Sequence, residues 1–113
     1  MGNINKTKRD QIMRELGHQE RVAGTEYIRT GLDIYHRGMG ITKELYPAIA
    51  RAHGTEPSRV ERAIRHSISS AWMRSSGEAA ARYFSDDMNG AWPTNGEYFA
   101  VMARLLHETE SAE

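Results

Sequence analysis

The sequence predicts an all-α protein of about six helices with a helix-turn-helix in the middle. Apolar residues recur at helical spacing between glycines and prolines, and no segment alternates with period two for long enough to form a strand. At 113 residues the chain has the length of one domain with a single hydrophobic core. We therefore expect one domain over residues 1–113.

Two helices are expected in the N-terminal third. The first spans about Lys6–Leu16 and ends at Gly17, since glycine is a common helix C-cap. The second spans about Thr25–His36, after Gly24, which is interpreted as a break between helices. Each has one apolar face that should pack inward. The residues of these faces are Ile12, Met13 and Leu16 in the first helix and Tyr27, Ile28, Leu32 and Tyr35 in the second.

A third helix is expected to begin at Thr42, as its N-cap, and to end at Gly54. Pro47 lies one turn inside it, which predicts either a tight turn over Thr42–Tyr46 or a bend. The buried face of this helix is expected to consist of Leu45, Tyr46, Ile49 and Ala50.

A short turn at residues 54–57 leads into a long fourth helix, Pro57–Arg74, capped by Ser58 or Thr55. A fifth helix is expected over Glu78–Phe84. A sixth follows over Thr94–His107, after a polar link, and the T-x-x-E pattern of Thr94 and Glu97 predicts a capping box at its start.

The net charge is zero, but the charges are segregated along the chain. Residues 1–42 hold seven basic and five acidic groups, residues 43–74 hold six and three, and residues 75–113 hold two and seven. This distribution indicates a basic central face suited to an anionic partner and an acidic C-terminal third. A mixed, solvated surface would account for it equally well, so both interpretations stay open on charge alone.

Several classes of protein are disfavoured by composition. The chain has no cysteine, no run of eighteen apolar residues and no N-terminal signal pattern, which predicts a soluble, cytoplasmic protein without a membrane partner. The five histidines lack metal-ligand spacing and are expected to be surface or capping groups. Asp86 and Asp87 are adjacent in a polar link, and carboxylates in such a position are usually solvated rather than catalytic. No catalytic residue, metal site or cofactor is therefore predicted.

The fourth helix carries the candidate functional residues. Two helices joined by a tight turn, the second bearing arginines on its outer face, form the unit that enters the major groove of DNA. Arg62 and Arg65 lie one turn apart in its N-terminal half, where an arginine fork can contact guanine, and Glu61 could accept a hydrogen bond from cytosine. The apolar face is expected to consist of Val60, Ile64, Ile68, Ala71 and Trp72, and the outer face of Arg59, Glu61, Arg62, Arg65 and Ser69.

Other residues near this unit are expected at the sugar–phosphate backbone. The third helix should cross the backbone, as the first helix of a helix-turn-helix does, bringing Lys43 and Arg51 to phosphates. Ser58 stands at the start of the fourth helix and is placed in the same group. His66 could contact phosphate or pack beside the turn.

The sequence also resembles the C-terminal effector domain of the stage-zero sporulation response regulators of endospore-forming bacteria. The resemblance extends from about Gly24 to Leu106, and its most specific part is the nine-residue block SRVERAIRH. The matching segments are Ile41–Pro47, Ser58–His66, Ala71–Trp72 and Pro93–Asn95.

This resemblance implies a six-helix domain that binds short operator boxes in double-stranded DNA, often as tandem copies that associate with each other. It also implies contact with the sigma subunit of RNA polymerase. In the family, the residues matching Arg59, Glu61, Arg62 and Arg65 approach base edges, and the residue matching His66 lies near the DNA backbone. Residues 75–92 match weakly, so the resemblance assigns no sigma contact there.

Members of that family also carry an N-terminal aspartyl-phosphate receiver domain. Here only a few residues precede the matching helices, so phosphorylation control is not expected. The start Met-Gly-Asn and the divergent sequence favour a stand-alone product over an excised domain. Two functions remain: a sequence-specific DNA-binding transcriptional regulator, or a protein-interaction module that binds a full-length regulator instead of DNA. The retained arginine and glutamate set on the fourth helix favours the first, because a module freed from DNA has no reason to keep it.

Overall fold

The computed structural model describes residues 4–75, 77–84 and 92–111. Within them the chain forms six α-helices, one π-helical turn and no strand, which confirms the predicted all-α class and the number of helices. The elements are α1 (Lys6–Leu16), α2 (Ala23–Ile34), η1 (Ile41–Leu45), α3 (Tyr46–His53), α4 (Pro57–Arg74), α5 (Glu78–Tyr83) and α6 (Asn95–Ser111).

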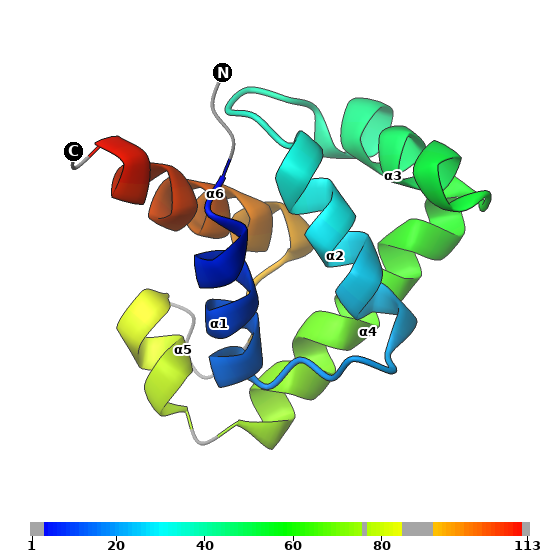
Figure 1. Cartoon of the computed structure of the whole chain (residues 1–113). Helices are drawn as coiled ribbons and strands as arrows, with labels where there is room; N and C mark the ends of the chain where they lie inside the picture. Colours follow the sequence, from blue (N-terminus) through cyan, green and yellow to red (C-terminus); the bar gives the residue numbers. More distant parts are fainter. Residues whose placement is uncertain (1–3, 76, 85–91, 112–113) are drawn as a thin grey trace.

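Helix α4 is the longest element and runs along one edge of the molecule (Figure 1). Helix α2 packs along it, and α3 contacts both α2 and α4 at one end. Helices α1 and α6 contact each other, while α6 also contacts α2 and α4, and α5 lies against α1. On the side of α4 that faces away from these helices, Arg59, Arg62 and Arg65 are exposed.

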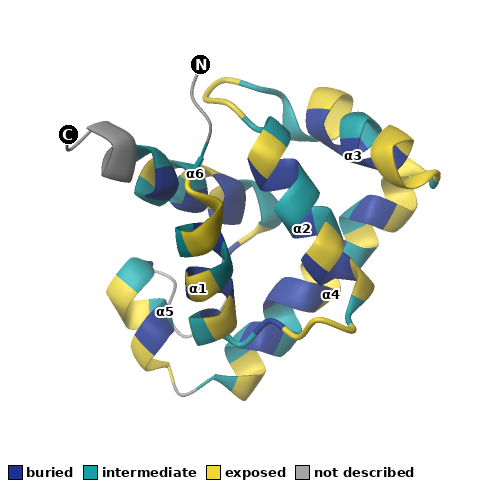
Figure 2. Ribbon diagram, viewed as in Figure 1, coloured by how far each residue is buried: buried dark blue, intermediate teal, exposed yellow. Residues whose placement is uncertain are grey.

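The core is built from the inward stripes of the helices, whose buried residues face the centre (Figure 2). In α4 the buried apolar residues are Val60, Ile64, Ile68 and Ala71, as predicted, and Trp72 is half-buried with its ring edge-on to Phe84. The other buried apolar residues are Ile12, Met13, Leu16, Ile28, Leu32, Leu45, Tyr46, Ile49, Ala50, Ala79, Phe84, Tyr98, Phe99, Met102 and Leu106.

Three predicted helix ends are confirmed. Gly17 and Gly54 terminate α1 and α3 in the left-handed region, at φ of 102° and 65°, which glycine adopts without a Cβ penalty. At the start of α6, the Thr94 N–H donates to Glu97 Oε1 at 2.9 Å and the Glu97 N–H donates to Thr94 Oγ1 at 3.1 Å. These two bonds are the predicted capping box.

The predicted start of the third helix is wrong. Thr42 does not cap it; Gly40 precedes the turn, and its N–H donates to Glu44 Oε1 at 2.6 Å. The turn before Pro47, which is the second residue of α3, is not tight. The preceding turn is instead wider, with the Tyr46 N–H donating to the Ile41 carbonyl five residues back. A wide turn suits this position because proline lacks an N–H and its ring crowds the carbonyl four residues earlier.

The predicted cap of the fourth helix is also wrong. Neither Ser58 nor Thr55 caps α4: Glu56 is the N-cap, without a side-chain bond, and Pro57 is the first helical residue. Proline is well suited to that position because its missing N–H would have no partner inside the helix. The long helix itself begins and ends where it was predicted, at Pro57 and Arg74.

Gly24 is not the break between helices that the sequence suggested. It is the second residue of α2, which begins two residues before the predicted start. A Cβ at Gly24 would lie 2.1 Å from the Ala63 carbonyl oxygen and 2.7 Å from Ser67 Cβ. The missing side chain therefore allows the backbones of α2 and α4 to approach each other closely.

His18 is another departure, because it is buried where a surface or capping histidine was expected. It lies just after α1 with 9% of its surface exposed. Its Nδ1 is 2.8 Å from Ser67 Oγ of α4, and its Nε2 is 2.9 Å from the Tyr98 hydroxyl of α6. Burial, together with the positive charges of Arg29 and Arg74, lowers the pKa of His18 to about 4.

Replacing Gly24 with alanine tests the close approach of α2 and α4. The added Cβ meets backbone rather than a flexible side chain, so we expect Gly24→Ala to lower the free energy of unfolding by about 3 kcal/mol or more. Gly96→Ala is the matched control, because a Cβ in that helix would meet nothing closer than Ile41 Cγ1 at 3.7 Å. It should be neutral or gain up to about 1 kcal/mol. Urea unfolding measures both, and equal effects would contradict this account of the contact.

The lowered pKa of His18 predicts a contribution to the free energy of unfolding that is lost in acid. The unfolded state takes up a proton near pH 6.5, whereas the folded state does so only near pH 4. This contribution is therefore fully present above pH 6.5 and is lost as the pH falls toward 4, by about 3 kcal/mol in all. His18→Gln removes the titration but leaves the carboxylates unchanged. The stability gap between wild type and this variant should narrow by about 2 kcal/mol from pH 7.5 to 4.5, and a constant gap would show that His18 does not titrate this way.

Candidate nucleic-acid interface

Helices α3 and α4 form the predicted helix-turn-helix. Gly54, in its left-handed conformation, ends α3, and the Thr55 N–H donates to the Ala50 carbonyl at 3.0 Å before α4 begins at Pro57. Helix α4 has 18 residues and so is about 27 Å long. Its N-terminal half has the length that a major groove can accept.

The predicted base-contacting residues all lie in the first three turns of α4, on the side of the helix opposite its buried face. Arg59, Arg62 and Arg65 are exposed, and Glu61 is partly exposed at one border of this surface. The structure thus brings the four residues together on one outward face. Their contacts with bases remain a prediction.

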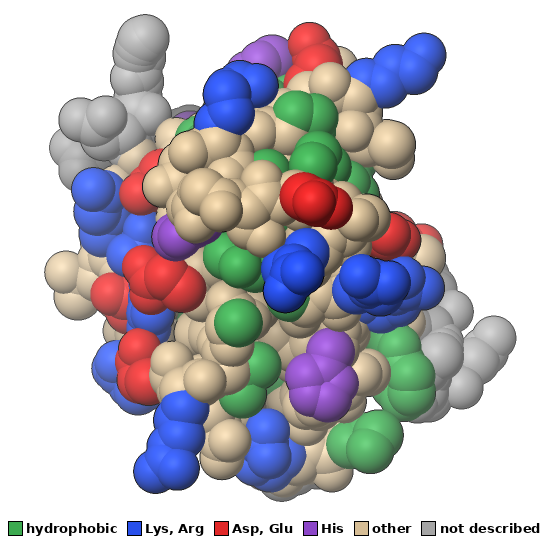
Figure 3. Space-filling model, turned by 90° about the vertical axis from the view of Figure 1, so that its right-hand side faces the viewer, with side chains coloured by type: hydrophobic (Ala, Val, Ile, Leu, Met, Phe, Trp, Pro, Cys, Tyr) green, Lys and Arg blue, Asp and Glu red, His purple; other side chains and the backbone are tan. Residues whose placement is uncertain are grey.

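The residues predicted at the DNA backbone are also exposed. Ser58 and His66 belong to α4, Lys43 lies in η1 and Arg51 in α3. Figure 3 shows the side of the molecule on which α3 and α4 lie, where Lys and Arg side chains gather with a histidine below them and carboxylates among them. Positive charge is therefore present here, although the whole chain is neutral.

One arginine of this face already has an acidic partner. Arg65 Nη2 lies 3.1 Å from Glu61 Oε2, one turn back along α4. The two side chains are 58% and 42% exposed, so solvent screens the pair and it contributes little to stability. Within the described residues, Arg59 and Arg62 form no such pair. Arg62 is therefore ready to contact an anionic or acceptor group, whereas Arg65 must share its charge with Glu61.

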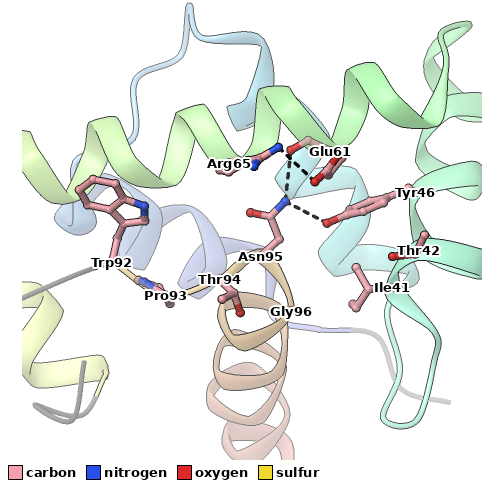
Figure 4. Close-up of a pocket in the computed structure, with 10 residues that line it drawn as sticks. All are labelled: Ile41, Thr42, Tyr46, Glu61, Arg65, Trp92, Pro93, Thr94, Asn95 and Gly96. Atoms are coloured by element: carbon pink, nitrogen blue, oxygen red, sulfur yellow. Dashed lines mark hydrogen bonds and ion pairs between the residues drawn. The ribbon is translucent and has the colours of Figure 1, made fainter. Parts of the chain in front are cut away.

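An open cleft of about 420 Å³ adjoins the Glu61–Arg65 pair, between α4, η1 and the start of α6 (Figure 4). Asn95 points from α6 toward α4, and its Nδ2 donates to the Tyr46 hydroxyl at 2.9 Å and to the Glu61 carbonyl at 3.2 Å. Burial, opposed by the Asn95 hydrogen bond and reinforced by the charge of Glu61, raises the pKa of Tyr46. Asn95 therefore joins both helices of the helix-turn-helix to α6.

Sequence reasoning missed the positioning role of Asn95. Its place in the N-terminal turn of α6 was visible, but its partners are 34 and 49 residues away, and no local pattern reports such contacts. Met73, near the end of α4, is 72% exposed. Asp86 and Asp87 lie outside the described residues.

No group of three or more His, Asp or Glu side chains close enough to hold a metal ion occurs in the part of the chain that the structure describes. The described helices also include none that is both long and apolar enough to cross a membrane.

The fold and this face together define a helix-turn-helix DNA-binding domain. Residues 10–106 match the family described as "Sporulation initiation factor Spo0A C terminal". The chain belongs to this family. The match begins before Gly24, where the resemblance was placed from the sequence, and so includes most of α1. The Spo0A C-terminal domain binds DNA and activates transcription, so this chain is a DNA-binding regulatory domain and not an enzyme.

The Glu61–Arg65 pair generates a prediction about non-specific binding. Glu61→Gln removes a negative charge from the face that meets phosphates and frees Arg65, so affinity for random duplex should rise severalfold at low salt. Glu56→Gln is the charge-matched control, since it removes the same charge at the N-cap of α4 without altering the pair. Fluorescence anisotropy measures both affinities. Equal gains in the two variants would show that only the total charge matters.

Proposed function

We propose that this chain recognises a short operator box in double-stranded DNA by placing the N-terminal half of α4 in the major groove. Arg59, Glu61, Arg62 and Arg65 would meet base edges there. Lys43, Arg51, Ser58 and His66 would hold the sugar–phosphate backbone on either side. The observation that carries the proposal is the shared exposure of these residues on the outward side of one helix-turn-helix.

The two groups of residues contribute differently to binding. Phosphate contacts supply affinity for any sequence and weaken steeply as salt rises, because binding releases counterions. A bidentate contact from arginine to guanine supplies about 1–3 kcal/mol of discrimination against the wrong base. Arg62 is a better candidate for that contact than Arg65, because within the described residues Arg65 is paired with Glu61 and no carboxylate holds the Arg62 guanidinium.

Further partners are inferred from the resemblance to the sporulation regulators. Self-association on tandem boxes and contact with the sigma subunit of RNA polymerase would both use surfaces outside the groove. Trp92 and Met73, which are 43% and 72% exposed, provide apolar area of the kind that protein partners cover. The expected cytoplasmic location agrees with this function, because a regulator must reach chromosomal DNA.

Two substitutions separate base recognition from charge attraction. Arg62→Ala should weaken binding to the preferred box, found by selection from random duplexes, by about 1–3 kcal/mol and change binding to random duplex little. Lys43→Ala should weaken both complexes by similar factors and reduce the slope of log affinity against log salt by about one unit. Fold should be unaffected, since both side chains are exposed.

The same titrations test the alternative that the chain binds a full-length regulator instead of DNA. A wild-type protein that selects no box from random duplexes would support that alternative. If a box is selected but Arg62→Ala binds it as tightly and as selectively as wild type does, α4 is not the recognition helix.

A further inference from the structure

A chain of buried polar side chains crosses the protein behind the recognition face. His18 contacts Ser67 of α4 through Nδ1 and Tyr98 of α6 through Nε2. Ser67 Oγ lies 3.4 Å from Thr25 Oγ1, and the Thr25 hydroxyl donates to the Gln19 carbonyl at 2.7 Å. All four side chains are at most 9% exposed, so each must find its hydrogen-bond partners inside the protein.

The direction of every hydrogen bond in this series follows from the Gln19 carbonyl at its end. The Gln19 carbonyl can only accept, so the single hydroxyl proton of Thr25 is committed to it. Ser67 must then be the donor to Thr25, which leaves Ser67 Oγ to accept a proton from His18 Nδ1. His18 Nε2 is left as an acceptor, and the Tyr98 hydroxyl donates to it. The geometry therefore specifies a neutral His18 that carries its proton on Nδ1.

Ser67 lies on a ridge of small residues along the buried side of α4. Ala63, Ser67 and Ala71 follow one another at intervals of one turn. The backbone of α2 at Gly24 approaches Ala63, and that of Gly17 approaches Ala71, where a Cβ would lie 2.8 Å from the carbonyl oxygen. Such a ridge lets the backbones approach closely but has few side chains that interlock with a neighbouring helix. The bond to Ser67 is directional and adds to the hold on α4 that its buried Val60, Ile64 and Ile68 provide.

We propose that His18 is a positioning residue for DNA recognition: by joining Ser67 of α4 to Tyr98 of α6, it sets the rotation of the recognition helix about its own axis. The inference rests on the proposed function, in which α4 is the helix that contacts bases. A rotation of 10° moves a side-chain tip 5–6 Å from the axis by about 1 Å. That displacement is enough to lose a bidentate hydrogen bond, which tolerates only a few tenths of an ångström.

The tautomer of His18 gives a direct spectroscopic test on the full chain. Long-range ¹H–¹⁵N correlation spectra at pH 7 should show His18 neutral, with its proton on Nδ1. In Thr25→Val, which removes the oxygen that accepts the Ser67 proton, Ser67 is free to reorient and this pattern should weaken. A proton on Nε2 in the wild type, or a charged ring, would overturn the assigned direction of the chain.

The effect on recognition is measured with Ser67→Ala and Tyr98→Phe, each of which deletes one hydroxyl and keeps the packing. We expect the ratio of affinities for the preferred box and for random duplex to fall three- to tenfold in both, with affinity for random duplex unchanged. Ile12→Val is the control, because it lowers stability through the core without altering the hydrogen bonds of His18. It should keep the wild-type ratio of affinities for the preferred box and for random duplex, when all variants are compared at a temperature at which they are folded.

These outcomes distinguish the inference from the function on which it rests. If Arg62→Ala lowers the specificity ratio while Ser67→Ala and Tyr98→Phe behave like Ile12→Val, His18 contributes to stability alone and the positioning role is overturned. If Arg62→Ala leaves the ratio unchanged, α4 is not the recognition helix. The proposed function then fails, and the positioning role fails with it.

Discussion

The contact between α2 and α4 is the constraint on which the rest of the structure depends. It is close because Gly24 has no side chain, so the α2 backbone lies directly against the Ala63 turn of α4. With α2 held there, a second glycine, Gly31, lies against Phe99 of α6 and Ile49 of α3, where a Cβ would meet ring and methyl carbons within 3 Å. One helix thus positions α3, α4 and α6 relative to one another, and the helix-turn-helix takes its geometry from this arrangement.

The buried polar groups also help to hold the helices in one arrangement. His18, Ser67 and Thr25 form hydrogen bonds where a core of this size would ordinarily hold apolar side chains, and Asn95 links α6 to Tyr46 and to the α4 backbone. Outside the core, Arg29 joins α1, α2 and the segment between them through Asp10, Glu20 and Glu26. Directional bonds of this kind specify one arrangement of helices, whereas apolar packing alone tolerates small shifts.

A neutral protein can bind DNA because affinity depends on where its charges lie. Several of the acidic side chains are committed to ion pairs: Asp10, Asp33 and Glu20 on the α1–α2 side all contact arginines. On the α4 face, by contrast, the arginines outnumber the carboxylates, and Glu61 is paired with Arg65. The electrostatic potential at the helix-turn-helix is therefore set by the charges on this face rather than by the total charge of the protein.

The sequence by itself determined what depends on short-range patterns. Helical periodicity located the six helices and the inward stripe of α4, glycine marked the ends of α1 and α3, and Thr94 with Glu97 identified the capping box of α6, because each signal lies within a few residues. Gly24 and His18 were misjudged because their environments come from residues 39 or more positions away. Only the tertiary structure decided that a glycine would be a helix contact and that a histidine would be buried between α4 and α6, because both outcomes depend on which helices pack together.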